Sequence, residues 1–157
     1  MDILKEQIAL RLKHSGPREV VLEETLREVL KRFRSETGTI HRLDVDKQLL
    51  HLVAQVGLPP PMLEVVKTIP VGKGIAGQVV ARGGPVSMCN LQTDTGGVAR
   101  PGARQTGVGG ALCVPLHNGG KITGTIGIGT IRPYEYTPDE THALEEIATL
   151  VGAFFHL

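Results

Sequence analysis

The two cysteines are the first residues that could do chemistry in this chain. Cys89 and Cys113 could serve a redox enzyme as nucleophilic thiolate and resolving thiol. Two cysteines are too few for a disulfide framework, and no Cys-x-x-Cys motif indicates a zinc site. The sequence favours the simpler role for both, as small buried apolar side chains.

A glycine pattern offers a second kind of chemistry. Gly72, Gly74 and Gly77 have the spacing of a dinucleotide-binding turn, and Asp94 follows about 20 residues later. The helix that starts here ends too soon, at the Gly-Gly-Pro of residues 83–85, for a crossover between parallel strands. The glycines instead predict a tight turn and close helix–sheet packing. Lys73 and Gly74 remain a weak candidate anion site at a helix start, although an exposed lysine is usually only solvated.

The strongest hairpin predicts a pocket. Residues 111–117 and 121–131 alternate in strand fashion around the turn at 118–120, where glycines supply positive φ. One face of this hairpin is large and aliphatic, and the other carries only small side chains, which leave room for a ligand or for close approach of the chain above. The glycine-rich loop 90–110 is expected to cover that face. The candidate pocket residues are Met88, Cys89, Asn90, Asp94, Arg100, Arg104, Gln105, Ala111, Cys113, Thr125, Gly127 and Gly129. The alternative is a pocket filled by the protein's own loop.

Other catalytic and metal chemistry finds little support. His41 and His51 could face each other across a hairpin, but two histidines without a third ligand make a poor metal site. No Gly-x-Ser-x-Gly motif and no paired carboxylates in a cleft sequence are present. We therefore predict no metal site and no obligatory cofactor.

The elements that must position these residues follow from periodicity and capping. Helices are expected at 2–14, 17–34, 74–82 and from residue 138 to the end, and one or two helical turns at 62–67. Strands are expected at 39–45, 48–56, 86–89, 111–117 and 121–131. Pro17 suits a first helical position, and Thr137 with Glu140 forms a capping box. Hairpins between terminal helices predict an α+β fold with an antiparallel sheet covered on one face.

Composition excludes several function classes. The 157 residues fit one domain, and a formal net charge of +1 gives no electrostatic footprint for nucleic acid or an anionic membrane. No apolar run is long enough to span a bilayer, and charges occupy the N-terminus where a signal peptide is apolar. We expect a cytoplasmic protein.

The order of short motifs resembles the GAF domain family. The resemblance covers roughly residues 20–156 and rests on these segments: 26–30 (LREVL), 38–44 (GTIHRLD), 69–77 (IPVGKGIAG), 84–86 (GPV), 114–116 (VPL), 124–127 (GTIG) and the helix from Thr137. It implies a PAS-related antiparallel sheet with the N- and C-terminal helices on one face and a loop-covered ligand pocket on the other. Residues 1–16 would be a helical extension of a GAF domain at 17–157.

The resemblance implies a regulatory role. Family members bind diverse small molecules or only dimerise. The Cys-His pair common in bilin attachment and the Asn-Lys-Phe-Asp-Glu signature of cyclic-nucleotide binding are both missing. One branch reduces free methionine sulfoxide and uses a third cysteine in the loop before the penultimate strand, where this chain has none.

We therefore expect a sensory domain with an unidentified small-molecule ligand and a possible protein partner in trans. Apolar residues such as Leu150, Phe154 and Phe155, together with Ile3, Leu4, Ile8 and Leu12, predict a homodimer through the terminal helices. Folding of residues 2–14 over the last helix within one subunit is the alternative. The alternative functions are a redox enzyme using Cys89 and Cys113, and a ligand-free dimerisation module.

Overall fold

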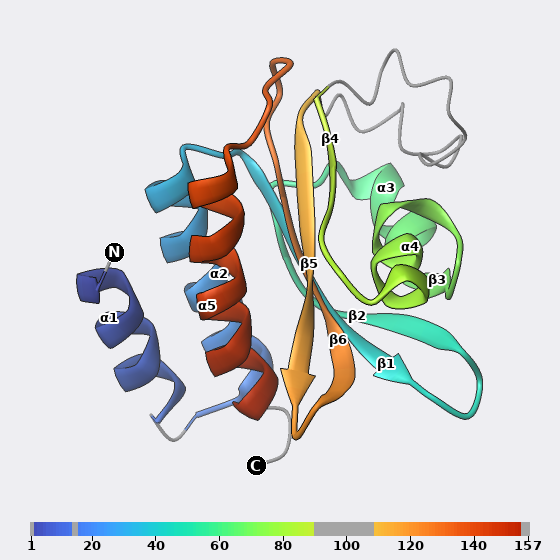
Figure 1. The fold of residues 1–157 in the computed structure, drawn as a ribbon, viewed down its shortest axis with the longest axis horizontal. Helices are drawn as coiled ribbons and strands as arrows, with labels where there is room; N and C mark the ends of the chain where they lie inside the picture. Colours follow the sequence, from blue (N-terminus) through green and yellow to red (C-terminus); the bar gives the residue numbers. More distant parts are fainter. Residues whose placement is uncertain (1, 14–15, 90–108, 155–157) are drawn as a thin grey trace.

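The sheet is the centre of the molecule. The computed structural model describes residues 2–13, 16–89 and 109–154. Within them, six strands form one sheet in the order β3-β2-β1-β6-β5-β4, and every neighbouring pair is antiparallel (Figure 1). The strands are β1 (Thr37–Asp44), β2 (Leu49–Val56), β3 (Thr68–Pro70), β4 (Val86–Met88), β5 (Ala111–Asn118) and β6 (Lys121–Gly129). The expected α+β class and antiparallel sheet are confirmed.

Helices lie on both faces of this sheet. They are α1 (Asp2–Leu12), α2 (Arg18–Phe33), α3 (Pro60–Val66), α4 (Gly74–Arg82) and α5 (Pro138–Phe154). The two long helices α2 and α5 cover one face, while α3 and α4 lie on the other (Figure 1). The main core lies under the long helices, where Leu26, Leu144 and Ile126 are fully buried in one cluster. The predicted placement of the terminal helices on one face is therefore confirmed.

Helix α1 packs against the long helices of its own subunit. Leu4, Ile8 and Leu12 belong to the main core cluster. The side chains that the sequence places four residues apart on one helix face therefore point toward the core. Arg11 forms ion pairs with Glu24, at 2.5 Å, and with Glu28 on α2. These contacts correspond to the intramolecular alternative for residues 2–14, and they cover apolar residues that we had expected to promote a dimer.

The C-terminal end of α5 is covered as well. Phe154 is only 9% exposed, and the guanidinium of Arg18 lies 5.4 Å from its ring centroid. Phe155 lies outside the described residues. Phe154 therefore offers little exposed apolar surface for a dimer interface. The homodimer itself stays a prediction.

Local signals account for most element ends. The Glu140 N–H donates to Thr137 Oγ1 at 3.1 Å, and the Thr137 N–H donates to Glu140 Oε1 at 2.8 Å, which is the reciprocal capping box expected before α5. Pro17 precedes α2 instead of opening it, because its ψ of 130° is extended. The short strand β3 was missed: three residues ending in proline carry no alternation that could reveal it.

Candidate functional site

The strand register brings the predicted small residues onto one face. Cys113 pairs with Gly127, and Gly127 in turn pairs with Thr39 of β1. In the next row Thr125 pairs with His41. Because side chains alternate along a strand, all five lie on the face opposite the long helices. The hairpin face predicted from sequence therefore exists, and β1 extends it with Thr39 and His41.

Helix α4 fills one side of this face. Ala76 and Val79 of α4 are buried in a cluster with Cys113, and Ile75 packs on Ala111 together with Met88. The close approach depends on Gly77, where a β-carbon would lie 2.5 Å from the Pro70 carbonyl oxygen. Near Ala111 and Cys113, which are both buried, the small side chains thus allow close packing of α4, and the ligand room expected on this face stays a prediction.

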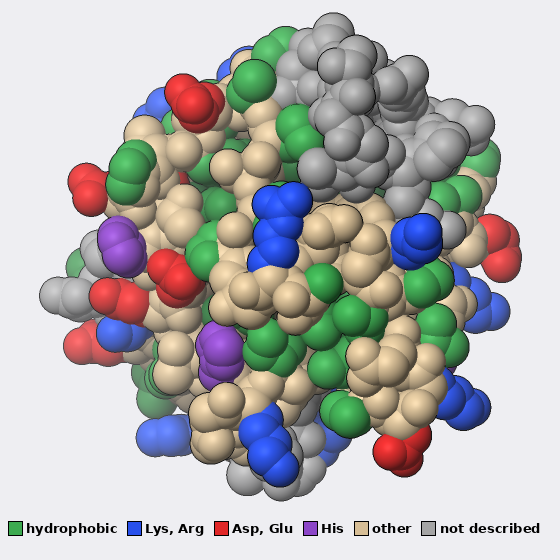
Figure 2. Space-filling model, turned by 45° about the vertical axis from the view of Figure 1, so that its right-hand side comes forward, with side chains coloured by type: hydrophobic (Ala, Val, Ile, Leu, Met, Phe, Trp, Pro, Cys, Tyr) green, Lys and Arg blue, Asp and Glu red, His purple; other side chains and the backbone are tan. Residues whose placement is uncertain are grey.

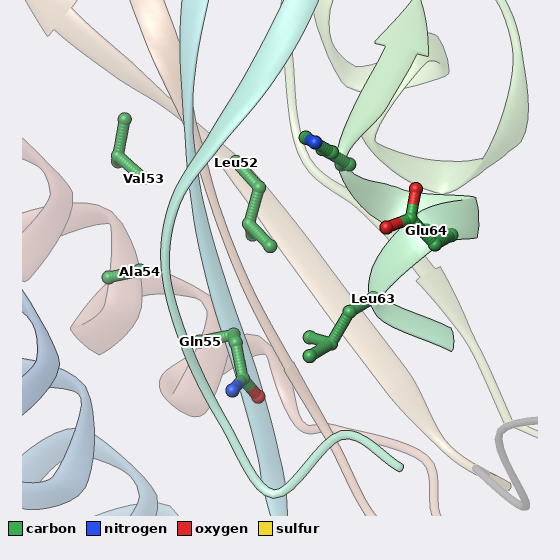
Figure 3. A pocket seen from close by; sticks show the side chains of 7 residues that line it. Leu52, Val53, Ala54, Gln55, Leu63 and Glu64 are labelled. Carbon is green, nitrogen blue, oxygen red and sulfur yellow. The ribbon is translucent and has the colours of Figure 1, made fainter. Parts of the chain in front are cut away.

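An open hollow remains on the other side, between β2 and α3. It has a volume of about 400 Å³ and is lined by Leu52, Val53, Ala54, Gln55, Leu63, Glu64 and Lys67. Leu52 and Gln55 from the strand and Leu63 from the helix point into the same space, whereas Val53 and Ala54 lie on the far side of the strand (Figure 3). The hollow is an apolar cleft with an amide in its base and charged groups at its rim.

A half-buried row of residues runs from the hollow across the middle of the sheet. Gln55 pairs with Thr39, and Thr39 pairs with Gly127. All three are partly exposed, although Gly127 belongs to a central strand. The row defines a floor of Gln55, Thr39 and Gly127 that reaches from β2 to β6, which we call the polar floor.

His41 is the most deeply buried ionisable side chain beside this floor. It is 1% exposed, and its Nε2 lies 2.8 Å from the Val66 carbonyl oxygen at the end of α3. A carbonyl only accepts, so Nε2 carries the proton and Nδ1 of the neutral ring is an acceptor. Burial lowers the pKa of His41 to about 4, opposed by the bond to Val66. Nδ1 itself has no hydrogen-bond partner.

Thr125 and Cys113 complete the buried polar group. The Thr125 hydroxyl is fully buried and has no partner of ordinary hydrogen-bond geometry. Burial raises the pKa of Cys113 to about 12, and the nearby Thr125 hydroxyl opposes that rise. Cys113 is therefore an inert thiol at neutral pH, in the buried apolar role that the sequence favours. For Cys89 that prediction is wrong, because its side chain is exposed.

The two cysteines do not meet. Cys113 pairs with Val86 of β4, and exposed Cys89 lies three residues further along that side of the sheet. Three residues of strand span about 10 Å, whereas a disulfide needs α-carbons within about 7 Å. A direct disulfide between Cys89 and Cys113 would require the backbone to move.

The remaining predicted site residues divide into two groups. Asn90, Asp94, Arg100, Arg104 and Gln105 lie outside the described residues. Lys73 and Gly74 stand at the start of α4, as expected, with Lys73 exposed.

The turn before α4 uses its own backbone donors. The N–H of Lys73 donates to the Pro70 carbonyl, and that of Gly72 donates to the Gly77 carbonyl. The tight turn predicted from the glycines is thus confirmed, and the antiparallel sheet excludes the dinucleotide-binding interpretation.

The described parts of the chain also limit other chemistry. They contain no group of three or more His, Cys, Asp or Glu side chains that could hold a metal ion, and His51 faces Arg42 across the hairpin instead of His41. None of the helices described is both long and apolar enough to cross a membrane. On the face shown in Figure 2, Lys and Arg side chains stand apart from one another and form no continuous basic patch.

Sequence reasoning missed the part of the site contributed by β1, β2 and α3. Thr39 and His41 flank Ile40, which is buried in the helix-side core. That alternation places both polar residues on the opposite face, and it could have been read from the sequence. Gln55 carried no such signal, because a bulge shifts the β1–β2 register between Ile40 and His41. Leu63 carried none either, because its place beside β2 depends on how the short helix α3 packs.

Comparison with known structures gives the same fold at low sequence identity. A free methionine-R-sulfoxide reductase from Neisseria meningitidis, in complex with its substrate, has a TM-score of 0.80 and 19% identity over 98% of this chain and 86% of that chain. The GAF domain of an Acinetobacter phosphoenolpyruvate-protein phosphotransferase has a TM-score of 0.81 and 19% identity, over 98% and 90%. The reduced form of the Staphylococcus aureus fRMsr has a TM-score of 0.76 and 19% identity, over 98% and 93%.

The fold and the family comparison agree on the class of protein. A six-stranded antiparallel sheet with flanking helices is the α+β architecture shared by these structures. The family model for the GAF domain matches residues 16–156, so this chain belongs to the GAF domain family. A comparison with curated protein sequences gives no match.

Proposed function

We propose that this chain is a sensory GAF domain that binds a small molecule on the α3 and α4 face of its sheet. The observation that carries the proposal is the hollow of about 400 Å³ beside the polar floor. Small-molecule sites are typically clefts of about 300–1,000 Å³ that are mostly apolar with a few polar groups. The volume of the hollow lies within that range and Leu52 and Leu63 give it apolar walls, while its open side leaves part of a bound molecule in contact with solvent.

The lining indicates how a ligand would be held. Leu52 and Leu63 offer apolar contact from two elements. The Gln55 Oε1 atom accepts the Leu58 N–H at 3.2 Å, which leaves the amide NH₂ group as a donor toward a ligand. The polar floor supplies the Thr39 hydroxyl next to it.

A hydrogen-bonded connector links the β4 edge of the sheet, opposite the edge that carries the hollow, to the long helices. Between β6 and α5, the Tyr134 N–H donates to the Cys89 carbonyl, and the Tyr136 hydroxyl lies 2.7 Å from Ser35 Oγ after α2. Tyr134 also donates from its hydroxyl to Glu140 in the first turn of α5. A structural change at the β4 edge would pass through this connector to the helices, and from them to a protein partner in trans.

Native mass spectrometry of the purified full chain tests the proposal. We expect a co-purified small molecule, or a ligand found by thermal-shift screening of metabolites. The variant Leu63→Asp, in the wall of the hollow, should lose it. Leu10→Asp is the matched control, because Leu10 is 64% exposed on α1. A wild-type protein that neither retains nor binds any molecule, or equal binding by both variants, contradicts the proposal.

A reductase is the second candidate, because a substrate-bound free methionine-R-sulfoxide reductase shares the fold. The buried Cys113 thiol with its raised pKa and its distance from Cys89 count against it. Turnover of free methionine-R-sulfoxide with a dithiol reductant, in wild type and in Cys89→Ser and Cys113→Ser, decides between the two. Activity that either substitution abolishes would favour the enzyme.

Thiol labelling of the native protein examines the same point from another side. We expect a thiol reagent such as iodoacetamide to modify exposed Cys89 and to spare Cys113 until the protein unfolds. Intact mass measured before and after denaturation reports the count. Rapid native labelling of both thiols would contradict the inert role of Cys113.

A further inference from the structure

Two buried polar atoms beside the polar floor lack partners. His41 Nδ1 and Thr125 Oγ1 belong to residues that are 1% and 0% exposed, and neither atom has a partner of ordinary hydrogen-bond geometry, although the Cys113 thiol lies close to Thr125 Oγ1. His41 and Thr125 are direct cross-strand partners on β1 and β6, so their side chains lie side by side on one face. A buried polar group without a partner is costly, and here two such groups stand together.

The hydrogen-bonding role of His41 Nδ1 is fixed. Because the His41 Nε2–H group is committed to the Val66 carbonyl, Nδ1 can only accept a hydrogen bond. The Thr125 hydroxyl can donate or accept. A group that presents an N–H or O–H donor beside an acceptor, such as an amide, satisfies both atoms at once. A carboxylate satisfies Thr125 and leaves Nδ1 facing a second acceptor.

Among the described residues, the polar floor next to the pair is uncharged. Thr39, Gln55 and Gly127 are uncharged residues, and Cys113 is held as a neutral thiol beside them. The ionisable residues of the hollow, Glu64 and Lys67, are exposed at its rim. Burying an unpaired charge against such a floor is unfavourable.

The pair lies next to the polar floor, one cross-strand row further along the sheet. Thr39 precedes His41 by two residues on β1, as Thr125 precedes Gly127 on β6, so the two rows are roughly 7 Å apart along the strands. Thr39 and Gly127 beside the pair are half-buried, whereas the pair itself is buried, so a ligand group reaches it from the polar floor only when the side chains above the pair move aside.

We propose that the ligand bound on this floor ends in an uncharged donor–acceptor group of the amide or lactam type, hydrogen-bonded to His41 Nδ1 and Thr125 Oγ1. Its apolar body lies between Leu52 and Leu63. A carboxylate or phosphate is rejected at this end. The inference rests on the proposed function, because it names the class of ligand for that site.

A matched pair of probes tests this class. Isovaleramide and isovalerate have the same branched body and differ in the amide against the carboxylate. Each is titrated into the full chain at constant ionic strength and neutral pH, followed by ¹H–¹⁵N NMR with the imidazole of His41 labelled. We expect saturable shifts at His41, Thr39 and Gly127 with isovaleramide, and at least tenfold weaker binding of isovalerate.

Two threonine variants separate recognition from folding. Thr125→Val keeps the shape and removes a hydroxyl that has no partner, so the melting temperature should stay the same or rise while isovaleramide binding weakens at least tenfold. Thr125→Ser should restore binding. Thr25→Val is the matched control: Thr25 is equally buried, but its hydroxyl donates to the Val21 carbonyl at 2.8 Å on α2. That variant should lower the melting temperature and leave binding unchanged.

The outcomes distinguish this inference from the function on which it rests. Tighter binding of isovalerate at the same residues, or amide binding that Thr125→Val does not weaken, overturns the inference while the floor remains a ligand site. Shifts with neither probe also overturn it, and native mass spectrometry then decides separately whether the domain binds a ligand of another class.

Discussion

The two faces of the sheet are built from the same strands but from opposite kinds of side chain. Under α2 and α5, strands β1, β6 and β5 present large aliphatic residues, of which Ile40, Ile126 and Val114 are fully buried. One residue along, the same strands present Thr39, Gly127 and Cys113. The first face is closed by matching apolar surfaces, and the second is covered by α4 on one side and open beside α3 on the other.

The difference indicates that the face under α2 and α5 serves stability and that the α3 and α4 face serves binding. Within the sheet, the described side-chain atoms that are buried without a partner, His41 Nδ1 and Thr125 Oγ1, both lie on the α3 and α4 face. The other described side-chain atoms that are buried without a partner, Arg11 Nε and Glu28 Oε2, belong to an ion pair between α1 and α2 and not to a strand. Natural domains tolerate such unsatisfied groups mainly where a site requires them, which is why the second face is the place to look for binding.

The largest expected effect is a loss of unfolding free energy from a substitution in the face under α2 and α5. Ile126→Ala removes a fully buried side chain that packs among the helix-side core residues, and such a substitution costs about 2–5 kcal/mol of unfolding free energy. Urea denaturation followed by circular dichroism measures it. Ile131→Ala is the control, because Ile131 is 66% exposed and should change stability by less than about 0.5 kcal/mol. A loss below about 1 kcal/mol for Ile126→Ala would mean that this face is not the core.

A pH effect of intermediate size belongs to the opposite face. The pKa of His41 is lowered from 6.5 to about 4 on folding, so the unfolded chain binds the proton more readily. Stability is therefore fully present above pH 6.5 and declines as the pH falls toward 4. A shift of this size corresponds to about 3 kcal/mol, at 1.36 kcal/mol per pKa unit.

The measurement compares urea unfolding at pH 7.5 and pH 4.5 in the wild type and in His41→Leu. The variant should lose most of that pH dependence. His142→Leu is the control, since the His142 side chain is 78% exposed and should keep the wild-type slope. An unchanged slope in His41→Leu would show that His41 titrates alike in both states.

The sequence and the structure agree best where alternation is regular. The last hairpin, with Cys113, Thr125 and Gly127 on one face, could be predicted because strand period and glycine turn are both local signals. The start of α5 followed from its capping box. The hollow could not be predicted, because it depends on how the short helix α3 meets β2 after the bulge in the hairpin. Which small residues would be covered by α4 was a question of tertiary packing, and periodicity carries no information on it.

The smallest expected effect on stability comes from Gly127→Ala, a substitution on the α3 and α4 face. A β-carbon added at Gly127 would lie 3.3 Å from Thr39 Oγ1 and 3.5 Å from Cys113 Sγ, a tight contact that a threonine rotation can relieve. Gly→Ala also restricts the unfolded chain by about 0.4–1 kcal/mol, so the net change in unfolding free energy should stay within about 1 kcal/mol. The methyl group nevertheless occupies the polar floor, and ligand binding should weaken.

Gly124→Ala, three residues earlier on β6, is the contrasting variant, because its β-carbon would lie 2.0 Å from the His41 carbonyl oxygen and should destabilise the fold strongly. Denaturation and ligand titration of both variants test the point. A Gly127→Ala protein that is as stable as the wild type and binds as well would remove the polar floor from the site.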